Sequence, residues 1–194
     1  HLPQRVPPAF RQQPVPVAGW PGTDSPARPR LLLPKTGRRR LRRICESWGS
    51  ATLIEDAFEV REYDPKKTVK VGPLQLSFCP VPHYIETCAI EVRSKKGRRV
   101  TYGADCAPNE ELVAFAHETD LLIIEATLPR AESTGPRGHL TPSEAGDHAR
   151  RARARQVLLT HISDELDEQW ALERAMESYG AALQIAAPGM ILTL

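Results

Sequence analysis

The stretch Asp120-Leu-Leu-Ile-Ile-Glu-Ala-Thr127 decides the fold class of this 194-residue chain. Its short apolar run predicts a buried strand over 121–125. A helical pattern precedes this strand at about 109–117. A second helix at about 142–153 leads to another apolar strand at 157–160. This alternation of helices and strands indicates a layered α/β domain.

Shorter strands are predicted before this alternation. Apolar and polar residues alternate over 58–60 and 74–78, as they do in half-buried strands. Strands at about 88–92 and 99–102 flank residues 94–97, Ser-Lys-Lys-Gly, which predict a hairpin turn. The N-terminal part of the domain is therefore expected to be antiparallel.

A final helix is predicted at about 164–178, followed by strands near 183–186 and 190–194. Three apolar side chains of this helix are expected to face the core: Leu166, Trp170 and Met176.

Composition excludes several classes of protein. The chain is 41% hydrophobic and 26% charged, as ordinary globular domains are. No apolar run approaches the roughly 20 residues of a membrane-spanning helix, and no signal peptide is apparent, so we expect no membrane association. Four cysteines are scattered without a CxxC pair, which argues against a zinc ribbon and fits a cytoplasmic location.

Charge and proline content change near residue 43. Residues 1–43 hold ten Lys/Arg and one acid, a balance of +9, whereas the remainder holds sixteen bases and twenty-three acids, a balance of −7. Half of the eighteen prolines lie before residue 35. This composition predicts an irregular segment over 1–43 and a folded domain over 44–194.

The basic run near residue 40 has two interpretations. Its arginines could contact RNA or another polyanion. Alternatively, they form the solvated start of a helix that runs to about Trp48, and no aromatic residues are interleaved for stacking on bases. The candidate contacts are Arg38, Arg39, Arg40, Arg42 and Arg43.

Four ligand-type side chains stand at the ends of predicted elements: His83, Asp105, His139 and His161. Each of them alone could be a turn or capping residue. Together they predict a metal site or an acid–base site, because functional residues gather on loops held by a rigid sheet. Glu125 ends a buried strand and is interpreted as a structural or supporting group.

His139 is placed by the sequence that follows it. Thr141-Pro-Ser-Glu144 has the form of a capping box, so His139 precedes a helix N-terminus, where a phosphate is favoured. His117 and His148 lie within predicted helices among charged residues, and both are expected on the solvated surface.

From about residue 45 onward, the chain resembles the metallo-β-lactamase superfamily, in particular its ribonuclease Z-like and cyclic-nucleotide phosphodiesterase-like branch. The resemblance implies an α/β fold, an αββα four-layer sandwich, of which this chain has the C-terminal two-thirds and lacks much of the N-terminal sheet. Five segments carry it: Val81–Ile90, Tyr102–Asp105, Asp120–Thr127, Gly138–Ala145 and Leu158–Ile162.

The resemblance also implies a dinuclear zinc site. His83 would bind one metal, Asp105 would bridge the two, and His161 would bind the second. His139 would be catalytic, facing the scissile phosphate and protonating it. Two metals of this kind generate a nucleophile near neutral pH and hold phosphate oxygens, and a histidine suits proton donation.

One family motif is absent from this sequence. His-x-His-x-Asp-His, which supplies further ligands to both metals, occurs nowhere in the chain. Each metal would keep one histidine and a share of Asp105, fewer than the three protein ligands usual in catalytic zinc sites. Two explanations of the missing motif are expected. The chain is either an incomplete gene product, which a start at His1 and not at Met favours, or a metal-poor relative that no longer catalyses.

The leading functional prediction is therefore a metal-dependent hydrolase, a phosphodiesterase acting on RNA or a cyclic nucleotide, whose activity in this chain is in question. A non-catalytic nucleotide- or RNA-binding module is the alternative, and a thioester or lactam hydrolase of the same fold is a third reading. If the inner face of the sheet is uncovered, its apolar surface would favour association, for example as a homodimer.

Overall fold

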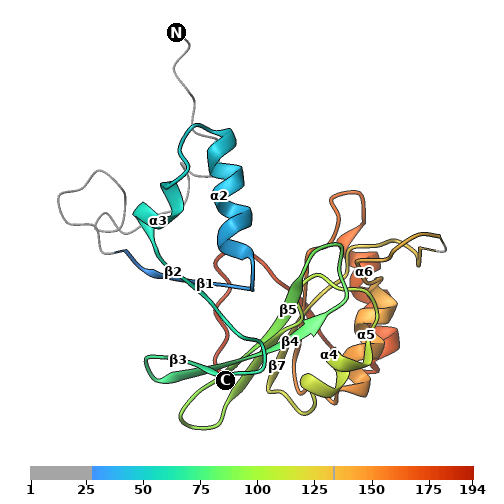
Figure 1. The fold of residues 1–194 in the computed structure, drawn as a ribbon. Coiled ribbons are helices and arrows are strands. Elements are labelled where there is room, and N and C mark those ends of the chain that lie inside the picture. Colours follow the sequence, from blue (N-terminus) through green and yellow to red (C-terminus); the bar gives the residue numbers. More distant parts are fainter. Residues whose placement is uncertain (1–27, 133) are drawn as a thin grey trace. The chain divides into compact units, whose positions relative to one another are not determined.

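The computed structural model describes residues 28–132 and 134–194, which divide into two compact units between Asp64 and Pro65 (Figure 1). The described part of unit 1 has two strands and two helices: β1 (Arg30–Leu33), α2 (Gly37–Ser47), α3 (Leu53–Ala57) and β2 (Glu59–Glu62). Strands β1 and β2 pair in parallel. Buried Cys45, Ile54 and Val60 form the small core of this unit.

The basic run belongs to α2. Helix α2 passes through the boundary predicted after residue 43, and β1 precedes it, so the described part of segment 1–43 is not irregular. The reason is that Leu41 and Cys45 are four residues apart, which places them on one helix face that packs on the unit 1 core. Residues 1–27 of that segment lie outside the described residues.

Unit 2 contains one seven-stranded mixed sheet in the order β3-β4-β5-β6-β7-β8-β9. The first four strands are antiparallel neighbours, and β6 to β9 are parallel neighbours. The strands are β3 (Val69–Val71), β4 (Leu74–Val81), β5 (Thr87–Arg93), β6 (Arg99–Tyr102), β7 (Leu121–Glu125), β8 (Val157–Thr160) and β9 (Gln184–Ile185). The predicted α/β class and the antiparallel start of the domain are thus confirmed.

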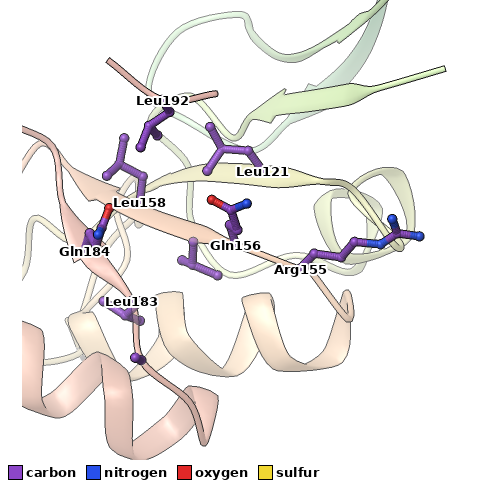
Figure 2. A pocket seen from close by; sticks show the side chains of 9 residues that line it. Leu121, Arg155, Gln156, Leu158, Leu183, Gln184 and Leu192 are labelled. Carbon is purple, nitrogen blue, oxygen red and sulfur yellow. The ribbon is translucent and has the colours of Figure 1, made fainter. Parts of the chain in front are cut away.

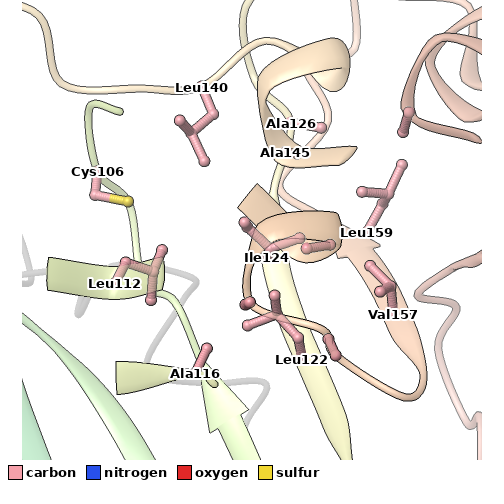
Figure 3. Packing of buried hydrophobic residues seen from close by; sticks show 14 of the residues in the cluster. Cys106, Leu112, Ala116, Leu122, Ile124, Ala126, Leu140, Ala145, Val157 and Leu159 are labelled. Carbon is pink, nitrogen blue, oxygen red and sulfur yellow. The ribbon is translucent and has the colours of Figure 1, made fainter. Parts of the chain in front are cut away.

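Three helices, α4 (Glu110–Phe115), α5 (Pro142–Arg151) and α6 (Glu168–Tyr179), pack on one face of this sheet (Figure 1). Figure 3 shows the core between them, where Leu122 and Ile124 of β7 and Leu159 of β8 meet small side chains of the helices. Each of these three side chains has 0% exposure. The apolar run that predicted the fold class is therefore the centre of the core.

Two predictions at the C-terminal end are wrong. Helix α6 begins at Glu168, because the side chain of Asp167 caps it by accepting a hydrogen bond from the Trp170 N–H. Its buried face therefore contains Ala171 and Ala175, and Trp170 is 37% exposed instead of facing the core. Residues 190–194 form no strand, and β9 is the edge of the sheet.

A cavity of about 250 Å³ lies at the amino ends of β7 and β8 (Figure 2). Ligands of α/β sheets are usually held at the carboxyl ends of the strands, so this cavity is not at the end of the sheet where a ligand site is expected. It is lined by Leu121, Arg155, Gln156, Val157, Leu158, Ala182, Leu183, Gln184 and Leu192. A further structural finding is that none of the helices in the described residues is long and apolar enough to cross a membrane.

Close contact between α5 and α6 depends on Gly146. A Cβ atom at this position would lie 2.2 Å from the Ala175 carbonyl oxygen, which is a backbone atom and cannot move without moving α6. In an open helix, Ala would stabilise by about 1 kcal/mol relative to Gly. At position 146 the overlap outweighs this gain, because overpacking costs about 1–3 kcal/mol or more, so Ala is expected to destabilise the fold.

We predict that Gly146→Ala lowers the free energy of unfolding by about 1–3 kcal/mol, measured by urea denaturation. The exposed Ser143 of the same helix provides the control, since Ser143→Ala is expected to change it by less than about 0.5 kcal/mol. Equal effects of the two substitutions would show that the helix contact is not as close as described.

Candidate metal centre

The sheet brings the predicted site residues to one edge. Strand β4 is antiparallel to β5, which is antiparallel to β6, so β4 runs in the same direction as β6, β7 and β8. His83 follows the carboxyl end of β4, Asp105 follows that of β6, and His161 follows β8 directly. Their loops therefore start from the same edge of the sheet, where ligand sites of α/β folds are found.

Three of the four predicted residues form a compact group, which we call the trio: Asp105, His139 and His161. One potential ligand atom from each lies within 4.8 Å of the others, and in residues 28–132 and 134–194 this is the one such group of three. Nδ1 of His161 is 3.6 Å from Oδ1 of Asp105. The His161 side chain is 49% exposed and that of His139 17%, so the trio is open to solvent on the His161 side.

His83 lies beside the trio and is not part of it. Its Nδ1 is 2.8 Å from the Gly138 carbonyl oxygen, which can only accept, so Nδ1 carries the proton and Nε2 is left free. The centroid of its ring is 5.0 Å from that of His139. His83 is thus oriented toward the same loop that carries His139.

Glu125 orients two of the trio's histidines. Its side chain is 1% exposed. One carboxylate oxygen accepts the Cys106 N–H at 2.8 Å and faces Nδ1 of His139 at 2.9 Å. The other oxygen accepts the Thr127 hydroxyl at 2.6 Å and its N–H at 3.2 Å. The carboxylate at the end of β7 therefore fixes the His139 ring and the start of the Asp105 loop together.

Thr127 extends this network to His161. Its hydroxyl oxygen is 2.8 Å from Nδ1 of His161. A hydroxyl has one proton, and the charged carboxylate of Glu125 is the strongest acceptor within reach, so Thr127 donates to Glu125 and accepts from His161. Both histidines thus present Nε2 as the nitrogen without a supporting partner in the network. Thr127 was not predicted from the sequence as a site residue.

Two backbone conformations aim the loops that follow β6 and β8. Ala104, directly before Asp105, has φ 56°, and His161 itself has φ 51°. This left-handed region costs of order 1 kcal/mol or more for residues with a side chain. Glu118 and Arg153 adopt it too, in ordinary turns, so strain alone does not identify the site.

The loop that carries His139 is fixed at the N-terminus of α5. The predicted capping box is confirmed, with Thr141 and Glu144 exchanging side-chain and backbone hydrogen bonds and Pro142 in the first turn. The Arg137 guanidinium pairs with the Glu144 carboxylate and donates from Nε to the His139 carbonyl at 3.0 Å. Burial would raise the pKa of Glu144, but the hydrogen bonds from Arg137 and Thr141 lower it below its ordinary value.

The prediction for His148 is wrong, whereas His117 is exposed as expected. His148 is 4% exposed, its Nε2 accepts the Asn109 N–H at 3.1 Å, and its Nδ1 faces the Glu144 carbonyl at 2.8 Å. It connects α5 to the cap of α4, so its helical position faces the core and not solvent.

All four cysteines are free, and burial raises the pKa of Cys106, next to Asp105, to about 12. Burial therefore disfavours the thiolate form of Cys106.

The comparison with known families places the chain in a superfamily. The family profile described as "Beta-lactamase superfamily domain" matches residues 24–162. The chain belongs to the metallo-β-lactamase superfamily. The fold predicted from the resemblance is therefore confirmed, and so is the membership itself.

Relatives in this superfamily are metal-dependent hydrolases. The chain is 29% identical over 100 residues to the probable metallo-hydrolase YhfI of Bacillus subtilis, covering 52% of this chain and 41% of YhfI. It is 32% identical over 115 residues to a ribonuclease Z of Haloarcula marismortui, covering 55% of this chain and 35% of that protein. The chain spans half or less of the length of the first curated relatives it matches.

Solved structures agree on the fold. A diphosphatase from the PhnP family superimposes with a TM-score of 0.67 at 20% identity, covering 91% of this chain and 62% of that one. At such identity the likeness concerns the fold alone.

The trio fits the divalent metal, usually zinc, that this superfamily uses. It offers a carboxylate and imidazoles, the ligand types found in catalytic zinc sites; Asp105 and His161 would be the ligands, and His139 would lie beside them. The hydrogen bonds that Nδ1 of His139 donates to Glu125 and Nδ1 of His161 donates to Thr127 are the supporting contacts that histidine ligands have.

We predict that Glu125→Gln weakens zinc binding by roughly 10- to 100-fold, the usual effect of losing a supporting group. The amide cannot accept four hydrogen bonds, so the His139 ring or the Cys106 N–H loses its partner. Zinc affinity is measured by competition with a chromophoric chelator.

Glu91 provides the matched control for this substitution. It is a carboxylate of the same sheet, 5% exposed, and it pairs with Arg93 and Arg99 instead of the trio. Glu91→Gln is expected to lower stability and to leave zinc affinity unchanged. If both variants lose zinc equally, the effect is one of folding and Glu125 has no specific role.

Proposed function

We propose that this chain carries the metal-binding and proton-donating part of a phosphodiesterase that acts on RNA or a cyclic nucleotide. The observation that carries the proposal is the position of His139. It lies in the trio, its Nδ1 is held by the buried carboxylate of Glu125, and it precedes the capped N-terminus of α5. A phosphate ester is the substrate class that suits such a position, because a helix N-terminus favours an anion.

His139 would supply the proton. Its Nδ1 donates to Glu125, and the carboxylate stabilises the positive charge of the ring when Nε2 is protonated. Nε2 then gives its proton to the oxygen that leaves the phosphorus. Arg137 would keep the His139 backbone in position through its carbonyl.

Asp105 and His161 would hold the metal, with His83 beside them for a second zinc of a dinuclear pair. When bound, zinc would neutralise charge on the phosphate and lower the pKa of a bound water. His161 is oriented for ligation by Thr127, and His83 by the Gly138 carbonyl. The relative named as a ribonuclease Z supports the substrate class.

We predict that the chain binds zinc and that Asp105→Ala weakens binding by more than the roughly 100-fold of a lost supporting group. Zinc per chain is measured by elemental analysis after gel filtration. Zinc-loaded chain is then tested on bis(p-nitrophenyl) phosphate, a β-lactam and a thioester, and we expect hydrolysis of the phosphodiester alone.

Asp147→Ala is the control, because this partly exposed carboxylate on α5 pairs with surface arginines. It should keep zinc affinity and turnover within about twofold of the unchanged chain, as a surface substitution. Absence of bound zinc, or zinc retained after Asp105→Ala, would contradict the assignment of Asp105. Hydrolysis of the lactam or thioester in preference to the phosphodiester would contradict the proposed substrate class.

A second candidate function is RNA binding without catalysis, and one feature of unit 1 favours it. A cavity of about 660 Å³ has four basic side chains in its wall, which would attract a phosphate backbone. It is lined by Lys35, Thr36, Arg38, Arg39, Arg42, Thr52, Glu55 and Glu62. Arg38 also donates to the Val60 carbonyl and so has a structural role, while Arg40 and Arg43 are exposed on the same helix.

If this candidate is right, the double variant Arg39→Gln/Arg42→Gln binds single-stranded RNA more weakly, and its salt slope falls by about 2, one for each phosphate contact. Binding is measured by fluorescence anisotropy over a range of salt. A double variant on α5, Arg150→Gln/Arg151→Gln, removes the same charge elsewhere. Equal losses in both would indicate binding to net charge and not to the cavity.

A further inference from the structure

An exposed aromatic side chain lies against the trio. Tyr84 is 53% exposed, and it belongs to the β4–β5 loop that also carries His83. Its ring centroid is 5.8 Å from that of His139 and 5.0 Å from that of His83, with tilted or edge-on geometry. The ring thus touches two histidines with part of its surface and leaves half of it to solvent.

Gly138 allows the Tyr84 ring to lie there. A Cβ atom at position 138 would be 2.4 Å from Cε2 of Tyr84 and 2.7 Å from Cζ, well inside any real contact. Any larger residue before His139 would therefore displace the ring. The ring therefore lies in space that only glycine at position 138 leaves open.

We propose that Tyr84 is the surface on which the base of a nucleotide stacks when its phosphate lies at the trio. This inference rests on the proposed function and deepens it, because it assigns the residue that would contact the nucleobase beside the reacting phosphate. Tyr84 is a specificity residue in this proposal, because it touches the substrate away from the reacting atoms.

Charge and polarity favour this ligand over others. The trio and His83 suit an anionic, hydrogen-bonding group, whereas the tyrosine ring beside them is apolar with a π-face. A ligand that fits both must combine an anion with a flat aromatic group. Bases stack on tyrosine in single-stranded nucleic acid sites regardless of sequence, since every base has a π-face.

The test compares two probes that share sugar and phosphate. Adenosine 5′-monophosphate carries a base and ribose 5-phosphate does not, and neither contains a phosphodiester that could be hydrolysed. Affinities for the zinc-equilibrated full chain are measured by calorimetry. The base should improve affinity by roughly 5- to 150-fold, the range that one base–aromatic stack gives.

Three variants identify the source of this preference. Tyr84→Ala should abolish the preference for adenosine 5′-monophosphate and leave ribose 5-phosphate binding unchanged. Tyr84→Phe should keep the preference, because the ring is retained, and Ile85→Ala should also keep it. Circular dichroism checks that each variant is folded, which half-exposed positions should allow.

Gly138→Ala gives an independent test through a double-mutant cycle. Alone, it should reduce the preference by displacing the ring. In the Tyr84→Ala background it should have no further effect on the ratio of the two affinities. A further loss in that background would mean that Gly138 acts through His83 or His139, and would overturn the role of the ring contact.

The outcomes separate this inference from the proposed function. If ribose 5-phosphate binds and adenosine 5′-monophosphate binds no better, the stacking role is overturned while a phosphate site at the trio stands. If the preference exists and survives Tyr84→Ala, the base binds elsewhere and the inference is again wrong. If neither probe binds, the phosphate site fails and the inference fails with it.

Discussion

The carboxylate of Glu125 is the group on which the candidate site depends. A charged group with 1% exposure is tolerated only if donors surround it, and here four donors do so. Those donors come from the Asp105 loop, the His139 loop and Thr127, which in turn binds His161. The energetic need to satisfy one buried charge therefore brings together three chain segments that are far apart in sequence.

Strand direction explains why these segments can meet. The strands before the three loops and before His83 all run the same way, although β5 between them is antiparallel. Small side chains on α5, and Gly146 against α6, let the helices pack closely behind the same sheet. The site is thus supported by a core in which small volume changes are costly, whereas the rim of the site, with Tyr84 and His161, is open to solvent.

The sequence predicts the centre of this molecule better than its ends. Strands β7 and β8 have the predicted bounds, since apolar runs without helical periodicity leave few alternatives. Strand β6 has them because the turn at 94–97 marks where it starts. The start of α6 depends on the Asp167 cap. Whether residues 190–194 form a strand depends on a pairing partner. The periodicity of the sequence shows neither. Asp105 and His161 each follow a predicted strand, and His139 precedes a capping box, so local signals predicted all three. Their supporting contacts from Thr127 and Arg137, and the burial of His148, result from tertiary packing, and no local pattern marks them.

Charge balance within the trio bears on what it can bind. Asp105 with a neutral His161 carries a charge of −1, so a bound dication would leave these two ligands at +1. A motif that added a further carboxylate would cancel this positive charge, unless the motif also brought a second metal ion. A group at +1 beside the N-terminus of α5 would attract an anion. The same trio would therefore bind a phosphate even where it no longer completes the hydrolysis. The binding hypothesis and the catalytic hypothesis then predict the same class of ligand and differ only in whether the ligand is turned over.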